Sequence, residues 1–187
     1  QLHLICNAMW RKRRKLKDKV ERKDVEEFCD SILKDERQNV RVRQNDWVKR
    51  KSEVWNTYRL LFAKANESIT IMSSYFLPGR TYRKLLSRAS ASGVKVRVIL
   101  AGKSDVAISK NAERYLYDWL LQKNIEIYEF ETTVLHAKMS VADNDMVTIG
   151  SYNVNNISAY ASLELNLDVK SKVFAQHIQD VMNNVIA

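Results

Sequence analysis

Apolar patterns with the period of a strand alternate with patterns of helical period along most of this chain, which limits the folds it can adopt. After a short strand pattern at Val40 and Val42 and a helical pattern over 47–66, the chain repeats the pair several times. The predicted strands are 68–73, 94–100 and 125–130, and the predicted helices between them are 80–92 and 107–122. Such alternation is typical of α/β domains, in which helices cover a largely parallel sheet.

This rhythm changes after Phe130. Residues 138–142 and 146–149 form two short apolar strand patterns separated by Asp143-Asn144-Asp145, which predicts a hairpin turn. A further strand is predicted over 163–169 and a closing helix over 172–186. We therefore expect an α/β fold with a mixed, largely parallel sheet sandwiched by helices.

The N-terminal region differs in composition from the rest of the chain. All four glycines and the only proline lie at or beyond position 78, and residues 8–35 carry a helical pattern with one apolar stripe. We expect residues 1–38 to be a basic helical extension or linker, and residues 39–187 to be one domain. Because the chain begins at Gln1 rather than Met, we also expect that a segment precedes it.

Positive charge is concentrated in that extension. Residues 11–23 hold nine basic and two acidic side chains, a net +7 of the chain's +9. Such a block attracts nucleic acid or an anionic membrane leaflet, or it is the solvated face of a helix. No apolar run approaches the roughly 18 residues that span a bilayer. Cys6 and Cys29 lack the spacing of metal ligands and are expected to be reduced structural thiols.

Polar side chains at regular spacing surround the predicted hairpin. His136 and Lys138 are two residues apart, as are Ser151 and Asn153, and this spacing places each pair on one face of a strand. Gly150 allows a ligand to approach the backbone closely. The two strands are therefore expected to present these four side chains to one spot.

The four side chains suit chemistry at a phosphodiester. An imidazole can attack phosphorus or transfer a proton near neutral pH, while lysine, serine and asparagine donate to phosphate oxygens. A third group must hold the imidazole in one tautomer, and Glu164 on the following strand is the candidate. The set requires no metal and no cofactor.

The run His136-Ala137-Lys138, then Asp143, then Gly150-Ser151 and Asn153 resembles the HxK(x)4D(x)6GSxN signature of the phospholipase D superfamily. Other segments resemble the C-terminal half of bacterial cardiolipin synthases, so that the resemblance covers roughly residues 40–187. These segments are 74–78, 93–97, 102–105 and 127–129. Ser74 departs from the family, in which proline is usual.

The resemblance implies a phospholipase D-like domain and a role for each motif residue. His136 would be the nucleophile that forms a phosphohistidine, or the partner general acid. The phosphate-binding side chains would be Lys138, Ser151 and Asn153. Glu164 falls where the family places the carboxylate that orients the imidazole. Asp143 would be structural, as would Gly150.

The family mechanism needs two imidazoles, but this chain supplies one HxK. The second would come from a missing N-terminal domain or from the mate in a homodimer, and we favour the missing domain. The resemblance then implies transfer of a phosphatidyl group from an anionic phospholipid to an alcohol, as in cardiolipin synthesis. The full-length protein would act at the cytoplasmic face of the cell membrane, while this chain would be soluble and weakly active or inactive by itself.

Two alternatives remain at this point. One is a homodimeric phosphodiesterase or endonuclease of the same superfamily, with residues 11–23 binding nucleic acid. The other is a non-catalytic binding module with the same fold. The sequence does not distinguish hydrolysis from transfer, because both use one intermediate and differ only in the hydroxyl that enters.

Overall fold

The computed structural model describes residues 39–103 and 106–186. The predicted helical extension, the basic block and the two cysteines lie outside these residues. No helix of the described ranges is both long and apolar enough to cross a bilayer.

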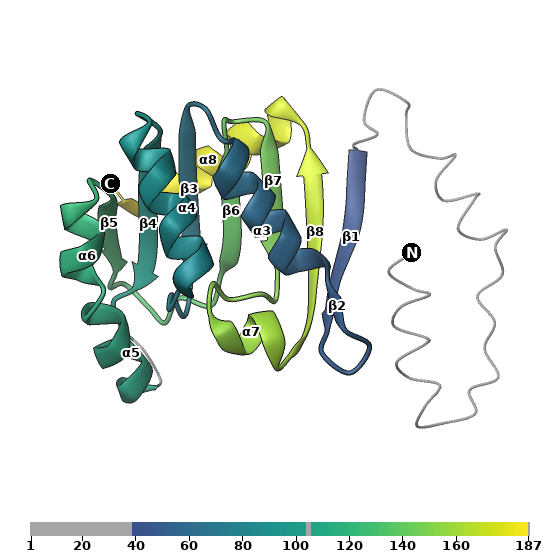
Figure 1. Cartoon of the computed structure of the whole chain (residues 1–187). Coiled ribbons are helices and arrows are strands. Elements are labelled where there is room, and N and C mark those ends of the chain that lie inside the picture. Colours follow the sequence, from purple (N-terminus) through teal and green to yellow (C-terminus); the bar gives the residue numbers. More distant parts are fainter. Residues whose placement is uncertain (1–38, 104–105, 187) are drawn as a thin grey trace, which may run out of the picture.

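One sheet of eight strands forms the centre of the domain, in the order β2-β1-β8-β7-β6-β3-β4-β5 (Figure 1). The strands are β1 Asn39–Asp46, β2 Lys51–Ser52, β3 Ser68–Ser73, β4 Lys95–Ala101, β5 Glu126–Phe130, β6 Lys138–Ala142, β7 Met146–Gly150 and β8 Leu163–Lys170.

The α/β class and the mixed sheet were predicted correctly, but the expectation of a largely parallel sheet is wrong. Only β3–β4 and β4–β5 pair in parallel, and the other five pairings are antiparallel. In the part of the chain that the structure describes, helical crossovers between parallel strands occur only between β3 and β5. The β6–β7 hairpin and β8 extend the sheet on the other side of β3, and β1 then joins β8.

Helices lie on both faces of the sheet (Figure 1). They are α3 Glu53–Lys64, α4 Arg80–Ala91, α5 Ala107–Arg114, α6 Tyr117–Gln122, α7 Asn156–Tyr160 and α8 Lys172–Ile186. The predicted helix over 47–66 begins only at Glu53, because residues 47–50 form a turn. The predicted helix over 107–122 is divided into α5 and α6, and α7 was not predicted.

Two apolar cores separate the sheet from its helices. Val98 and Leu100 of β4 belong to the core that contains α3 and α4, whereas Ile99 of the same strand belongs to the core that contains α8. Because successive strand residues point to opposite faces, a strand covered on both sides must be apolar throughout. This explains why residues 98–101, the second half of β4, form an unbroken apolar run.

Strand register brings distant parts of the chain to one edge of the sheet. Ser73 at the end of β3 lies opposite Lys138 at the start of β6. Gly150 at the end of β7 lies opposite Asn166, near the start of β8. The segments that leave β3 and β7 and the segments that enter β6 and β8 therefore meet at this edge, which carries the candidate site.

Candidate active site

The motif residues lie at strand ends rather than within two strands. Lys138 is the first residue of β6, and His136 lies in the segment that leads into it. Ser151 and Asn153 follow the last residue of β7. The predicted hairpin is confirmed, with Asp143 at φ 50° and its neighbour Asn144 at 49° in the left-handed region that Asp and Asn tolerate.

Lys138 is buried at the base of the site. The residue is 7% exposed, and its Nζ donates to the Ser74 hydroxyl at 3.0 Å and to the His136 carbonyl oxygen at 3.2 Å. A buried ammonium group requires such partners, since desolvation opposes its charge. These bonds fix the cation beside the segment that carries the imidazole.

The loop after β3 is a part of the site that the motif does not contain. The Ser74 hydroxyl, which accepts from Lys138, donates to the carbonyl oxygen of Ala137 at 3.3 Å. The backbone N–H of Tyr75 donates to Oδ1 of Asn153 at 3.3 Å. Ser74, noted in the sequence only as a departure from the family, thus connects this loop to the motif lysine.

Asn153 is held from two sides. Its Oδ1 accepts from Tyr75, and its backbone N–H donates to the Ser158 hydroxyl at 3.3 Å. The backbone N–H of Ser158 donates in turn to Asn155, whose side chain caps α7. Because Oδ1 already accepts from Tyr75, the side-chain NH₂ group of Asn153 is the part that could donate to a phosphate oxygen.

Ser151 and Glu164 contact each other at the open side of the site. The exposed Ser151 hydroxyl donates to the Glu164 carboxylate and accepts from the Leu165 N–H at 3.0 Å. The His136 side chain is exposed, and among the described residues it makes no hydrogen bond or ion pair. The structure thus brings Glu164 to Ser151, and the expected role of Glu164 toward an imidazole stays a prediction.

Asp143 lies at the opposite end of β6, away from the other motif side chains. Its carboxylate accepts from the backbone N–H groups of Asn66, Glu67 and Ser68 at 2.8 to 3.1 Å. These bonds attach the hairpin to the segment that enters β3. This geometry fits the structural role that the resemblance implies.

Gly150 permits a close backbone approach between β7 and β8. A Cβ at this position would lie 2.2 Å from the carbonyl oxygen of Leu165 and 2.5 Å from Oδ1 of Asn166. The glycine is therefore required for the strand pairing that delivers Ser151.

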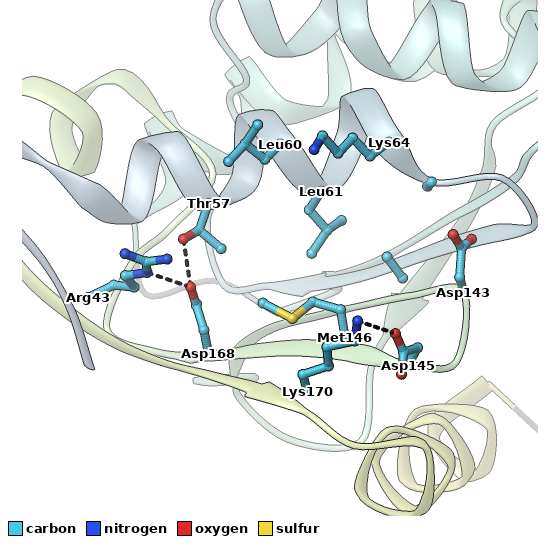
Figure 2. A pocket seen from close by; sticks show the side chains of 12 residues that line it. Arg43, Thr57, Leu60, Leu61, Lys64, Asp143, Asp145, Met146, Asp168 and Lys170 are labelled. Carbon is cyan, nitrogen blue, oxygen red and sulfur yellow. Dashed lines mark hydrogen bonds and ion pairs between the residues drawn. The ribbon is translucent and has the colours of Figure 1, made fainter. Parts of the chain in front are cut away.

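Two of the hollows in the described residues lie at opposite ends of the sheet strands. One of about 510 Å³ contains Asn153 and Glu164, and its other walls include the apolar side chains of Leu77 and Ile157. The other, of about 380 Å³, lies between α3 and the strand ends near Asp143 (Figure 2). Polar bonds join the walls of this second hollow. Asp168 Oδ2 accepts from Arg43 Nε at 2.8 Å and from Thr57 Oγ1 at 2.7 Å, and Lys170 Nζ lies 3.7 Å from Asp145 Oδ2. The hollow at Asn153 is the one that adjoins the motif.

A buried charge cluster supports the loop after β3. Lys110 Nζ donates to Glu113 at 3.1 Å, to Tyr117 at 3.0 Å and lies 2.7 Å from Glu129. The second oxygen of Glu113 accepts from the backbone N–H of Phe76 at 3.0 Å. Lys110 and Glu113 are only 8% and 3% exposed. We call these residues the Lys110 cluster, and through Phe76 it secures the loop that contacts Lys138 and Asn153.

Burial and pairing shift the pKa values in this cluster in opposite ways. Burial raises the pKa of Glu113, and the Phe76 N–H and Lys110 only partly oppose this effect. Burial also opposes ionisation of Glu129, but its bonds to Lys110 and Tyr117 dominate and lower its pKa. For Lys110, hydrogen bonds to the surrounding groups outweigh burial and raise the pKa.

No group of three or more metal-ligating side chains occurs in residues 39–103 and 106–186. The polar groups of the candidate site are the imidazole, the lysine, the hydroxyl, the amide and the carboxylate just described. The exposed imidazole of His136 thus lies at the same strand ends as the side chains of Lys138, Ser151 and Asn153.

The family model described as "Cardiolipin synthase, PLD-like domain" matches residues 58–186. The chain belongs to this family. It is 28% identical over 137 residues to cardiolipin synthase B of Escherichia coli, covering 73% of this chain and 33% of that protein. It is 30% identical over 117 residues to the probable cardiolipin synthase YwiE of Bacillus subtilis, covering 63% of this chain and 23% of that protein. The chain thus spans a third or less of these relatives.

Solved structures share its phospholipase D-like fold. Nuc of Salmonella typhimurium, a phospholipase D family member, aligns with a TM-score of 0.65 at 18% identity, covering 79% of this chain and 93% of that chain. NucT of Helicobacter pylori aligns with a TM-score of 0.65 at 15% identity, covering 80% and 96%. The predicted fold family is therefore confirmed.

Proposed function

We propose that this domain supplies one half of an active site that transfers a phosphatidyl group through a phosphohistidine, as part of a cardiolipin synthase. The observation that carries the proposal is the arrangement at the strand ends. An exposed His136 lies beside a buried lysine, with Ser151 and Asn153 on the neighbouring strand end. The family membership supports the same chemistry.

In the proposed first step, a ring nitrogen of His136 attacks phosphorus and the bond from phosphorus to the head-group oxygen breaks. A second imidazole gives a proton to the departing alcohol. In the second step, the acceptor hydroxyl loses its proton to that imidazole and attacks phosphorus, which releases His136. Lys138, Ser151 and Asn153 would donate to the non-bridging oxygens, and one such donor typically contributes about 3 kcal/mol to the transition state.

The second imidazole would come from outside this chain's motif. The chain spans a third or less of the cardiolipin synthases it matches, so a second half of comparable size is our preferred source. The Glu164 carboxylate, held by the Ser151 hydroxyl, would fix the tautomer of an imidazole at the open side of the site.

A nitrophenyl phosphodiester tests the half-site separately, because nitrophenolate leaves without needing a proton from the second imidazole. We expect the chain to acquire one substrate phosphoryl group, stable in alkali, which mass spectrometry of peptides places on His136. The His136→Asn variant should remain unlabelled, whereas His177→Asn, a matched change on α8, should be labelled like the wild type. Labelling elsewhere, or none in a folded wild-type chain, would contradict the proposal and favour a non-catalytic binding module.

A homodimeric phosphodiesterase or endonuclease is the second candidate. It is favoured by one observation, that a chain of this fold and size makes up nearly the whole of the solved Nuc chain. Sedimentation would then show a dimer, and the dimer would cleave DNA without any added domain. A monomer that is labelled at His136 and leaves DNA intact would support the half-site.

A further inference from the structure

The edge of the sheet that carries the candidate site exposes an unusual share of apolar surface. Of the fourteen large apolar side chains exposed in the described ranges, eight belong to elements at this edge. They are Trp47, Val48, Val106, Ile108, Val134, Ile157, Tyr160 and Leu163. Single exposed apolar residues are ordinary, but a concentration of them marks an interaction surface.

Five of the eight lie together on one side of the site. Asp46, which ends β1, pairs with Leu163 at the start of β8. The Asn45 side chain donates to the carbonyl oxygens of Ser158 at 3.1 Å and Ala159 at 3.4 Å, which fixes α7 against β1. The turn after β1 and helix α7 therefore lie at the same end of the molecule (Figure 1). We call this surface the α7 flank, and its exposed apolar residues are Trp47, Val48, Ile157, Tyr160 and Leu163.

The turn that presents Trp47 and Val48 has a defined structure. The buried Asp46 carboxylate accepts from the Lys49 N–H at 3.0 Å. Arg50 has φ 53°, and its N–H donates to the Trp47 carbonyl oxygen at 3.4 Å. Trp47 and Val48 are nevertheless 58% and 63% exposed, so this turn holds two apolar side chains in contact with solvent.

Three consecutive cations follow these apolar side chains. Lys49 lies 3.8 Å from the Asp46 carboxylate, but Arg50 and Lys51 have no ion-pair partner among the described residues. Tryptophan is enriched where a bilayer meets water, and basic side chains beside it are attracted to anionic lipids.

We propose that the α7 flank and residues 49–51 dock the domain on an anionic lipid bilayer. The hollow of the candidate site, which shares Ile157 with this flank, then opens at the level of the head groups. The inference rests on the proposed function in that the substrate is a lipid phosphodiester. No carboxylate of the described residues pairs with Arg50 or Lys51, so a protein surface that buried them would have to supply acidic partners, whereas anionic head groups neutralise them.

Tryptophan quenching by brominated lipid tests the contact directly. The chain is mixed with vesicles of phosphatidylglycerol and brominated phosphatidylcholine, and the quenched fluorescence is compared with that of Trp47→Phe. Both chains carry Trp10→Phe, since Trp10 adjoins the basic block 11–23, which can itself attract anionic lipid. We expect most of the quenching to disappear with the Trp47→Phe change, because Trp55 and Trp119 are partly buried and pack against the core. Removing the apolar pair with Trp47→Ser and Val48→Ser should raise the lipid concentration for half-binding about tenfold or more.

Two controls separate this contact from other causes of binding. Val173→Ser removes a valine that is even more exposed than Val48 from α8, at the other end of β8, and should leave binding and quenching unchanged. Binding should also require phosphatidylglycerol and weaken with salt in the wild type. Replacing Lys49, Arg50 and Lys51 by glutamine should reduce this salt dependence.

The lipid-binding test is independent of the labelling of His136, because the nitrophenyl substrate is soluble and labelling needs no bilayer. Unchanged quenching in Trp47→Phe would overturn the docking proposal even if His136 is labelled. An unchanged lipid concentration for half-binding in the Trp47→Ser and Val48→Ser variant would also overturn the proposal, and would assign vesicle binding to residues outside this surface. Self-association that depends on Trp47, with no lipid quenching, would make the α7 flank a protein interface instead.

Discussion

Replacing Lys110 with methionine should destabilise the domain in a pH-dependent way. Methionine fills much of the same space but removes the cation that pairs with Glu113 and Glu129. Glu129 is about a quarter exposed, so water can hydrate its carboxylate. Glu113, at 4% side-chain exposure, would instead be left as a buried carboxylate without a cation. Breaking a buried pair in this way costs about 3 to 5 kcal/mol, and we expect about 3 kcal/mol at pH 8.

The sign of the pH dependence follows from Glu113. Its pKa is already raised in the folded protein by burial, and loss of Lys110 raises it further. A raised folded-state pKa means that the protonated carboxyl stabilises the fold below the unfolded-state pKa, and that this contribution is lost as pH rises through the folded-state value. The destabilisation should therefore be largest at pH 8 and should shrink toward pH 5.

Urea unfolding followed by tryptophan fluorescence measures this effect. A loss of about 3 kcal/mol lowers the midpoint by about 1.5 M for a urea slope of about 2 kcal/mol per M. Lys95→Met is the matched control, since Lys95 forms an exposed pair with Glu126 at 3.3 Å and should cost about 0.5 kcal/mol. If Lys110→Met costs under 1 kcal/mol at pH 8, or costs the same at both pH values, the buried-pair reasoning is refuted.

Three other changes test the supports of the site. Asp143→Ala should cost about 2 kcal/mol in urea unfolding, because three backbone amides lose a charged acceptor and alanine disfavours positive φ, whereas Asp143→Asn should cost less. Gly150→Ala should destabilise the domain by about 2 kcal/mol or more in the same assay, because its Cβ would overlap the Leu165 carbonyl oxygen. Ser74→Ala should leave stability within about 1.5 kcal/mol of the wild type but slow the labelling of His136 with a nitrophenyl phosphodiester, because Lys138 loses a hydrogen-bond partner. Equal labelling rates for Ser74→Ala and the wild type would show that Lys138 needs no support from this loop.

Local sequence patterns predicted the elements of the fold better than their arrangement. The predicted bounds of strands 68–73 and 138–142 and of helix 172–186 agree with the structure to the residue. The parallel direction was predicted from the alternation of strands and helices before Phe130, and it holds for β3 and β4. On its other side, however, β3 pairs antiparallel with β6, a hairpin strand from later in the chain. A local apolar pattern carries no information about such a pairing.

The same distinction holds for the site. Fixed spacing identified the motif residues, because short segments deliver them to one edge of the sheet. Ser74, Lys110 and Glu113 were not predicted, since their contacts join segments distant in the sequence. A lysine and a glutamate three residues apart on a helix usually form a solvated pair, and only the fold shows that this pair is buried.

The hydrogen bonds that Asp143 accepts from residues 66–68 have a consequence for Lys138 at the other end of β6. By binding the amides that precede β3, this carboxylate sets the register in which β6 pairs with β3. A slip of one residue would turn Lys138 toward the opposite face of the sheet and put an apolar neighbour in its place. The motif's fixed spacing of four residues between Lys138 and Asp143 therefore sets how far the ammonium group lies from the end of β6 that Asp143 anchors.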